Sequence, residues 1–161
     1  MIGNVTFFGM KSARYALCHH EYETGAGMKE VKKKLDVLIV DGSKDMLRSM
    51  ANVLETAGLG VRAVMTGREA IQRLRESPET GVVILNSFLP DNSGFTVLEQ
   101  LKTNGCKASV IAVSASKDVG HRFVNAGACG FLEKPFDIKD LVGLCRDVLN
   151  GNSAWVKANK G

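Results

Sequence analysis

The sequence lacks any apolar run long enough to cross a membrane. A membrane-spanning helix needs roughly 18 or more consecutive apolar residues, whereas the apolar runs here, such as VLIV at 37–40, are far shorter. The opening stretch MIGNVTFFGMKSARYALCHH also lacks the basic start and apolar stretch of a secretory signal. We therefore expect a cytoplasmic protein with no membrane partner.

Cysteine is sparse and shows no pairing pattern. The four cysteines form no CxxC motif, which is typical of free thiols in a reducing compartment; they are Cys18, Cys106, Cys129 and Cys145. Only Cys18-His19-His20 clusters residues with metal-ligand chemistry, but adjacent residues rarely aim at one ion and no second cluster completes four ligands. We predict no metal site and no cofactor.

An excess of charge of one sign is also missing from the middle of the chain. The net charge is +4, and the basic excess lies near the two ends, most clearly at Lys32-Lys33-Lys34. A nucleic-acid binder needs basic side chains gathered on a structured face, so nucleic acid is not an expected partner. With 45% hydrophobic and 24% charged residues, the chain has the composition of one globular domain with tails.

Short apolar runs alternate with helical segments from residue 35 onward. Most runs are rich in Val and Ile, as expected of strands buried on both faces; they are VLIV at 37–40, VRAVM at 61–65, VVIL at 82–85, SVIAVS at 109–114 and GFLE at 130–133. A capping residue precedes each helical segment: Ser43, Thr66 in the T-x-x-E box with Glu69, Ser93, Ser116 and Asp137. This order predicts an α/β fold, a (βα)5 doubly wound five-stranded parallel sheet with helices on both faces.

The expected domain occupies residues 35–150. Residues 1–34 show no clear periodicity and are expected to be an N-terminal extension, either disordered or the result of a start assigned too far upstream, with Met28 as the alternative start. Residues 151–161 are expected to be a C-terminal tail, which leaves no room for an effector domain. Any output is therefore expected to come from the surface of the domain itself.

Polar side chains stand at the ends of four of the expected strands. Asp41 and Gly42 follow the first strand, Asn86 follows the third, Ser114 ends the fourth and Lys134 follows the fifth. In parallel sheets, ligands and chemistry gather at the carboxyl ends of the strands. We therefore expect these residues to meet on one rim, where function is to be sought.

Four short motifs behind these strands carry a resemblance to a known family. They are VDG at 40–42, NSFLPDNSG at 86–94, VSA at 113–115 and KPF at 134–136. In this order, the chain from residue 35 to 150 resembles the receiver domains of two-component response regulators. The resemblance implies the flavodoxin-like strand order 2-1-3-4-5 and a role in bacterial-type phosphorelay signal transduction.

The resemblance also assigns a role to seven residues. They are Asn86 at the position of the phosphate-accepting aspartate, Asp41 and Gly42 at the positions of two magnesium-binding carboxylates, Ser114 and Phe131 at the switch hydroxyl and switch aromatic, and Lys134 and Pro135 at the rim lysine and cis-proline.

Two departures from the family pattern change the chemistry expected at the rim. An asparagine amide has no charged oxygen and its nitrogen lone pair is delocalised, so Asn86 cannot attack phosphorus as an aspartate does. Magnesium wants anionic oxygens, but with Gly42 in place of a carboxylate, the charges of Asp41 and Lys134 cancel. We predict a phosphorylation-independent pseudo-receiver that is not an enzyme and acts through protein–protein interaction.

In the family, a metal ion and a phosphate occupy the space between the rim residues. Here, side chains of the rim itself are expected to fill that space. Lys134 is expected to pair with Asp41 and to donate to the side-chain oxygen of Asn86. Ser114 has two open interpretations, a strand-end hydroxyl bonded to the backbone or a retained switch residue.

The expected partner is a protein, either a histidine kinase or another signalling protein. In the family, the usual contact face consists of the fourth helix, the fifth strand and the fifth helix, which here includes His121, Phe131, Lys139 and Arg146. A homodimer is a further option.

Two further functions stay open on sequence grounds. One is a regulator phosphorylated at a non-standard residue, although Ser87 is expected to point to the opposite face of its strand end and Asp91 lies within the following loop. The second is a nucleotide- or flavin-binding flavodoxin-like protein, which is disfavoured because DGSKD, rather than a Gly-rich phosphate loop, follows the first strand.

Overall fold

The computed structural model describes residues 36–152. The predicted extension 1–34 with its alternative start at Met28, the Cys18-His19-His20 cluster and all but the first two residues of the predicted tail lie outside the described residues. The elements are β1 Val37–Val40, α1 Lys44–Thr56, β2 Val61–Val64, α2 Gly67–Glu76, β3 Val82–Asn86, α3 Gly94–Thr103, β4 Ser109–Ser114, α4 Lys117–Asn125, β5 Gly130–Glu133 and α5 Ile138–Leu149. No helix in residues 36–152 combines the length and apolar character that crossing a membrane requires.

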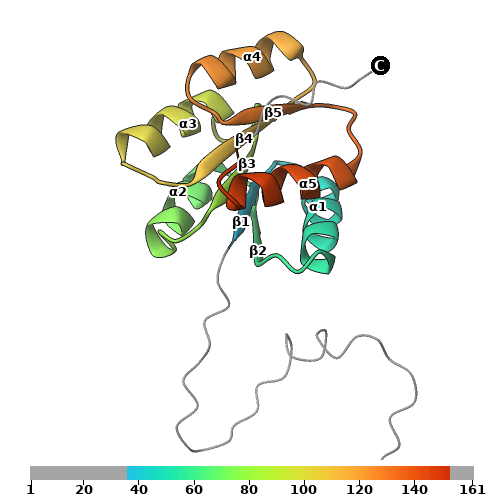
Figure 1. Cartoon of the computed structure of the whole chain (residues 1–161). Helices are drawn as coiled ribbons and strands as arrows, with labels where there is room; N and C mark the ends of the chain where they lie inside the picture. Colours follow the sequence, from blue (N-terminus) through green and yellow to red (C-terminus); the bar gives the residue numbers. More distant parts are fainter. Residues whose placement is uncertain (1–35, 153–161) are drawn as a thin grey trace, which may run out of the picture. The chain divides into compact units, whose positions relative to one another are not determined.

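The five strands form one parallel sheet in the order β2-β1-β3-β4-β5. This confirms the predicted flavodoxin-like order, in which the chain starts near the middle of the sheet and winds outward in both directions. Figure 1 shows the strands as a central layer with helices on either side. The carboxyl ends of all five strands therefore lie along one edge of the sheet.

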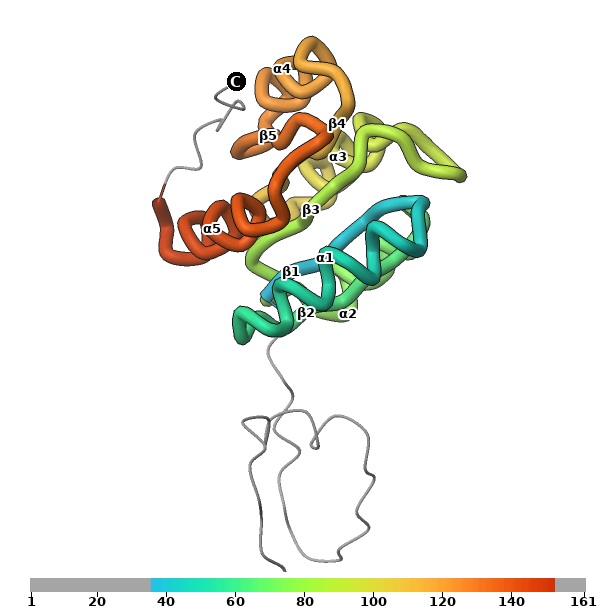
Figure 2. The backbone as a smooth tube through the Cα atoms, turned by 90° about the vertical axis from the view of Figure 1, so that its right-hand side faces the viewer, coloured from blue at the N-terminus to red at the C-terminus, as the bar shows by residue number. Residues whose placement is uncertain are grey.

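Alternate residues of each central strand pack into two separate hydrophobic cores, one on each face of the sheet. Val37 and Ile39 of β1 pack with the buried residues of α1 and α5, whereas Leu38 and Val40 pack with those of α2, α3 and α4. The period of two arises because successive side chains of a strand point to opposite faces. Figure 2 shows α1 and α5 together on one face of the sheet.

The predicted caps begin all five helices. Each cap side chain accepts a hydrogen bond from a backbone N–H in the first helical turn, and the caps are Ser43, Thr66, Ser93, Ser116 and Asp137. The capping box of α2 differs in one detail, because the Glu69 carboxylate accepts from the N–H of Met65 rather than from that of Thr66. The result is still a fixed helix start directly after β2.

Strand β2 departs from the expectation of strands buried on both faces. Arg62 and Ala63 at its centre are exposed, while Val64 is buried. The physical reason is position, because β2 lies at the edge of the sheet and pairs with β1 alone. The charged residue in the run VRAVM is typical of an edge strand.

Candidate functional site

The register of the sheet brings the predicted rim residues together. Val40 of β1 pairs with Leu85 of β3, so the next residues, Asp41 and Asn86, stand side by side. Asn86 in turn pairs with Val113 of β4. Ser114 pairs with the last residue of β5, which places Lys134 one step beyond it. The sequence prediction of one polar rim agrees with this arrangement.

Asp41 and Lys134 form an ion pair across the rim. The Lys134 Nζ atom lies 3.3 Å from Oδ2 of Asp41, whose side chain is only 3% exposed, whereas the Lys134 side chain is 29% exposed. The second carboxylate oxygen, Oδ1, accepts a hydrogen bond from the backbone N–H of Ser43 at 2.8 Å. Both oxygens of this buried carboxylate therefore have a donor, and the peptide bond that follows Lys134 is cis, before Pro135.

Asn86 is half-buried at the end of β3 and its side chain forms no hydrogen bond with another described residue. The hydrogen bond expected from Lys134 to Asn86 is therefore absent from the described part of the chain. The backbone around Asn86 is held tightly, because a Cβ added at Gly94 would overlap the Asn86 carbonyl oxygen. Gly94 also donates its N–H to the carbonyl oxygen of Ser87 at 3.0 Å, which closes the loop after β3.

Gly42 lies directly against Pro90 of that loop. A Cβ at position 42 would lie 2.9 Å from Cδ and 3.0 Å from Cγ of Pro90. Contacts this short require the proline ring to give way, so the position has little room for a carboxylate side chain. The sequence identified Gly42 as a missing charge, whereas the structure adds that the space for such a side chain is partly filled.

Asp91 lies away from the rim and caps the neighbouring helix. Its Oδ1 atom accepts from the N–H of Gly67 at 2.9 Å and its Oδ2 atom from the N–H of Arg68 at 3.1 Å, both in the first turn of α2. Partial desolvation raises the pKa of Asp91, but these backbone hydrogen bonds outweigh it and hold the pKa below its ordinary value. This tie between the β3–α3 loop and α2 could not be found from the sequence.

The same loop exposes an aromatic side chain. Phe88 is 80% exposed and is the one large hydrophobic residue that stands out in this way among the described residues. Its backbone is fixed by an isolated antiparallel bridge to Ser93, and Leu89 beside it is buried. No sequence pattern singled out Phe88, and only its place two residues after Asn86 could have drawn attention to it.

The two residues at the switch positions are both buried. Ser114 is 3% exposed, and its hydroxyl accepts a hydrogen bond from the backbone N–H of Ser116 at 3.1 Å. This matches the first of its two interpretations, a strand-end hydroxyl bonded to the backbone. Phe131 is 2% exposed and belongs to the core under α3 and α4. The ring of His121 meets the Phe131 ring edge-on at 5.2 Å between centroids.

The predicted contact face of α4, β5 and α5 is only partly made of free side chains. His121 and Lys139 are exposed. Phe131, by contrast, lies in the core, and Arg146 donates from Nη2 to the carbonyl oxygen of Ala57 at 2.8 Å, which ties α5 to the end of α1. Arg146 therefore has a structural contact that the sequence did not indicate.

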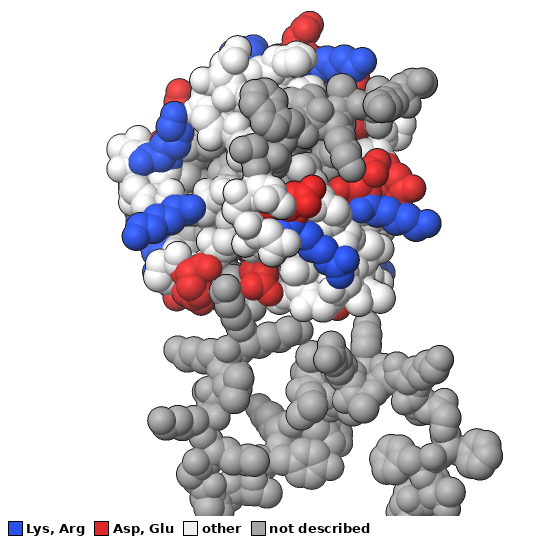
Figure 3. All heavy atoms as spheres, viewed as in Figure 1, with Lys and Arg blue, Asp and Glu red and all other residues white. Residues whose placement is uncertain are grey.

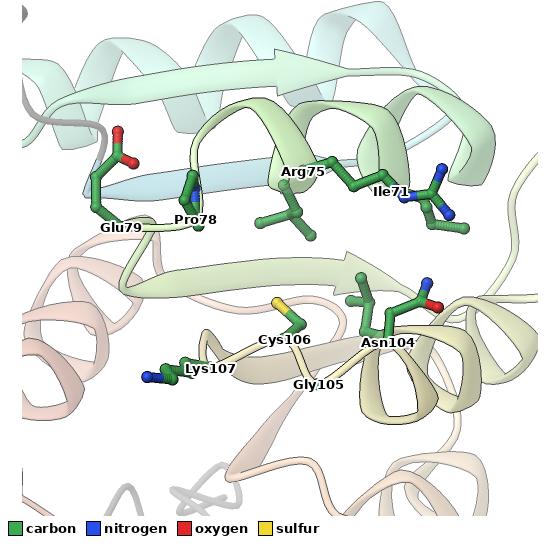
Figure 4. A pocket seen from close by; sticks show the side chains of 10 residues that line it. Ile71, Arg75, Pro78, Glu79, Asn104, Gly105, Cys106 and Lys107 are labelled. Carbon is green, nitrogen blue, oxygen red and sulfur yellow. The ribbon is translucent and has the colours of Figure 1, made fainter.

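A hollow of about 440 Å³ lies at the opposite edge of the sheet from the rim. Its walls come from the end of α2 and the segment before β3 on one side, and from the end of α3 and the segment before β4 on the other, as Figure 4 shows with Arg75, Pro78, Asn104 and Cys106. None of the rim residues lines it. Within residues 36–152, no group of three His, Cys, Asp or Glu side chains is placed to hold a metal ion.

The chain matches a known protein family over most of the described residues. Residues 37–146 match the response regulator receiver domain family. This match covers more than half of the chain, and the chain belongs to this family. The match identifies residues 37–146 as the receiver domain of a response regulator in two-component signalling. Receiver domains are in general non-enzymatic signalling domains that interact with kinases and other proteins.

Several relatives and solved structures are similar to this chain. The transcriptional regulatory protein KdpE of Mycobacterium tuberculosis is 33% identical over 120 residues, 73% of this chain and 52% of KdpE. The two-component response regulator ORR5 of Oryza sativa is 28% identical over 117 residues, 70% of this chain and 87% of ORR5. The chain spans about half the length of the first bacterial relatives it matches, such as KdpE.

Among the solved structures, the CheY-like receiver domain protein of Methanospirillum hungatei is 26% identical, with a TM-score of 0.67 over 72% of this chain and 94% of that one. The receiver domain of NtrC4, in a beryllofluoride-activated dimer, is 27% identical, also with a TM-score of 0.67, over 72% of this chain and 97% of that one. Both likenesses extend over nearly the whole of the solved domain.

Proposed function

We propose that this receiver domain works without phosphorylation, as a pseudo-receiver that signals through protein contacts. The observation that carries the proposal is the placement of Asn86. It ends β3 beside Asp41, at the rim position where the family's acceptor aspartate is expected. An amide at this position cannot form an acyl phosphate, because it offers no anionic oxygen to attack phosphorus.

The rim also fits magnesium poorly. Magnesium takes anionic oxygens in near-octahedral order and is reluctant to lose its waters. Asp41 is the single carboxylate among the rim residues Asp41, Gly42, Asn86, Ser114 and Lys134, and its two oxygens already accept from Ser43 and Lys134. Gly42 offers no ligand, and Pro90 occupies the space beside it. These contacts support a rim in which the lysine ammonium, rather than a metal ion, balances the charge of Asp41.

The two nearby substitutes for the acceptor are poorly placed. Asp91 has its carboxylate engaged with the N-terminus of α2, through Gly67 and Arg68. Ser87 lies just beyond β3, where its backbone N–H donates to the carbonyl oxygen of Val113 at 2.9 Å, and within residues 36–152 its hydroxyl has no hydrogen-bond partner that could act as a base. Phosphorylation at a non-standard residue is therefore the weaker of the two regulatory hypotheses.

Binding of a nucleotide, a flavin or a nucleic acid gains no support from the described residues. The segment after β1 begins α1 at Lys44 with a serine cap and carries no Gly-rich loop for a nucleotide or flavin phosphate. On the face drawn in Figure 3, Lys and Arg side chains alternate with Asp and Glu rather than forming one basic patch. A non-enzymatic role and a location in the cytoplasm stay predictions.

We place the partner-binding surface on the α4, β5 and α5 face, with a histidine kinase or another signalling protein as partner and a homodimer as a second option. His121 and Lys139 are the exposed side chains of the predicted set on this face. Phe88 adds an exposed aromatic side chain on the rim loop, where its backbone bridges to Ser93; aromatic residues often anchor protein interfaces.

The experiment is incubation of the full chain with acetyl phosphate and magnesium, followed by intact-mass measurement. The proposal expects no phosphoryl adduct on the native chain, since the acceptor oxygen and most of the metal-binding charge are missing. A stable adduct at any residue would favour a regulator phosphorylated at a non-standard residue, and peptide mapping would then identify the acceptor.

A further inference from the structure

Helix α4 packs on β5 through a glycine that leaves no room for a side chain. Gly120 is buried in the middle of α4, and a Cβ built on it would overlap the ring of Phe131 at three carbon atoms. Glycine inside a helix is unfavourable relative to alanine, by about 1 kcal/mol. Its presence here is explained by the close approach of the Phe131 ring to the helix backbone.

The Phe131 ring is enclosed on several sides. It belongs to the same core cluster as Phe123 of α4, and it is 2% exposed. On its outer side, the His121 ring meets it edge-on at 5.2 Å, with an interplanar angle of 64°. The ring therefore fills a notch that Gly120 opens in the helix and that His121 covers.

Helix α4 is also tied at both ends. At its start, Lys117 lies 3.6 Å from the Glu133 carboxylate at the end of β5. At its end, the Nζ atom of Lys102 in α3 donates to the carbonyl oxygen of Ala126 at 2.6 Å. The rim contacts the start of α4 as well, because the backbone N–H of its cap, Ser116, donates to the Ser114 hydroxyl at 3.1 Å.

We propose that Gly120 and Phe131 form an interlock that holds α4 on β5 in one conformation. This inference goes beyond the proposed function, because it concerns the surface of α4 rather than the chemistry at Asn86. Its consequence is that the exposed side chains of α4, His121 and Arg122, are presented to a partner in a fixed arrangement. A partner that recognises this arrangement needs no ligand to populate it.

The test compares two helical glycines by urea unfolding. Gly143 of α5 has no atom within 4 Å of an added Cβ, so Gly143→Ala is expected to raise the folding equilibrium constant about fivefold through helix propensity. Gly120→Ala is expected to be about 5- to 150-fold less favourable than Gly143→Ala, because the methyl group overpacks the notch. In a Phe131→Val background, the ring is gone and Gly120→Ala is expected to behave like Gly143→Ala.

The ring-proton NMR signals of His121 give a second readout. They are expected to shift in Gly120→Ala, because the Phe131 ring has to leave the notch, and to stay in place in Gly143→Ala. If Gly120→Ala does not fold, recovery of folding in the Phe131→Val background supports the interlock.

Three results would overturn the interlock. They are a Gly120→Ala variant as stable as Gly143→Ala, an equal loss in both backgrounds, and a failure to fold in both. An acetyl phosphate adduct on the native chain, by contrast, would overturn the proposed function and leave these results unchanged.

Discussion

Replacing Lys134 by alanine tests the internal charge balance of the rim. The change removes one of two donors to Asp41, a carboxylate that is only 3% exposed. An unsatisfied buried charge costs several kcal/mol in the interior. Since the Lys134 side chain is 29% exposed and Ser43 still donates to Asp41, solvent screening reduces the loss, and we expect about 1–3 kcal/mol. For a domain of this size, that corresponds to a fall in melting temperature of about 4–12 °C.

The assay is thermal and urea unfolding followed by circular dichroism at neutral pH. Lys117→Ala serves as the matched control, because Lys117 is 57% exposed and lies 3.6 Å from Glu133, at the end of the same strand. An exposed pair of this kind contributes little, so the control is expected to change stability by no more than about 0.5 kcal/mol. An unchanged melting temperature in Lys134→Ala, or equal losses in both variants, would refute the reasoning.

Two further predictions concern titratable groups. Desolvation raises the pKa of Asp91, but backbone hydrogen bonds, chiefly from the N–H groups of Gly67 and Arg68, together with the charge of Arg68 outweigh it and hold the pKa below its ordinary value of 3.8. The stabilising effect of Asp91 is therefore present above that value and lost as the pH falls through the lower folded pKa. Asp91→Ala is expected to be less stable than the native chain at pH 7, by under about 1 kcal/mol after solvent screening, and the gap should narrow in urea melts as the pH falls below 3.8; a gap that widens in acid would contradict this. Burial, with Cys129 nearby as a lesser cause, raises the pKa of the Cys145 thiol to about 12. Alkylation of Cys145 by iodoacetamide in the folded protein at pH 8 is therefore expected to be slower than that of an ordinary thiol by on the order of a thousandfold; mass spectrometry showing rapid native labelling would argue against this environment.

Much of the fold could be read from local patterns. The run VLIV predicts the bounds of β1, and SVIAVS those of β4, because buried parallel strands are short and nearly unbroken in their apolar character. Ser43 and Asp137 were found as caps for the same kind of reason, since capping depends on residues a few positions apart. The edge exposure of β2 was missed because strand order is a property of the whole sheet.

The site shows the same division between local and non-local features. The rim position of Asn86 and the pairing of Asp41 with Lys134 followed from the strand ends and from opposite charges that have to meet there. The contact of Gly42 with Pro90 joins two loops that are far apart in the sequence, and no pattern around either residue encodes it.

The features around α4 and the rim loop could not be predicted from the sequence for a related reason. That Phe131 lies inside the core depends on the absence of a side chain at Gly120, on another element. The carboxylate of Asp91 could have pointed to water or to several backbone donors, and the choice of α2 is made by packing. The expected bond from Lys134 to Asn86 is absent among the described residues although an ammonium has three donors, because the position of the lysine head in the folded chain, rather than its donor number, decides which partners it reaches.

The central claim, that this receiver takes no phosphate, is tested most directly by intact mass after treatment with acetyl phosphate and magnesium. The matched control is the double variant Gly42→Asp/Asn86→Asp, which restores both carboxylates that the rim lacks and shows that the conditions can detect an adduct. Its folding is checked first, because a side chain at position 42 presses on Pro90. The account predicts a phosphoryl adduct on the double variant and an unmodified native chain. A phosphorylated native chain would contradict it.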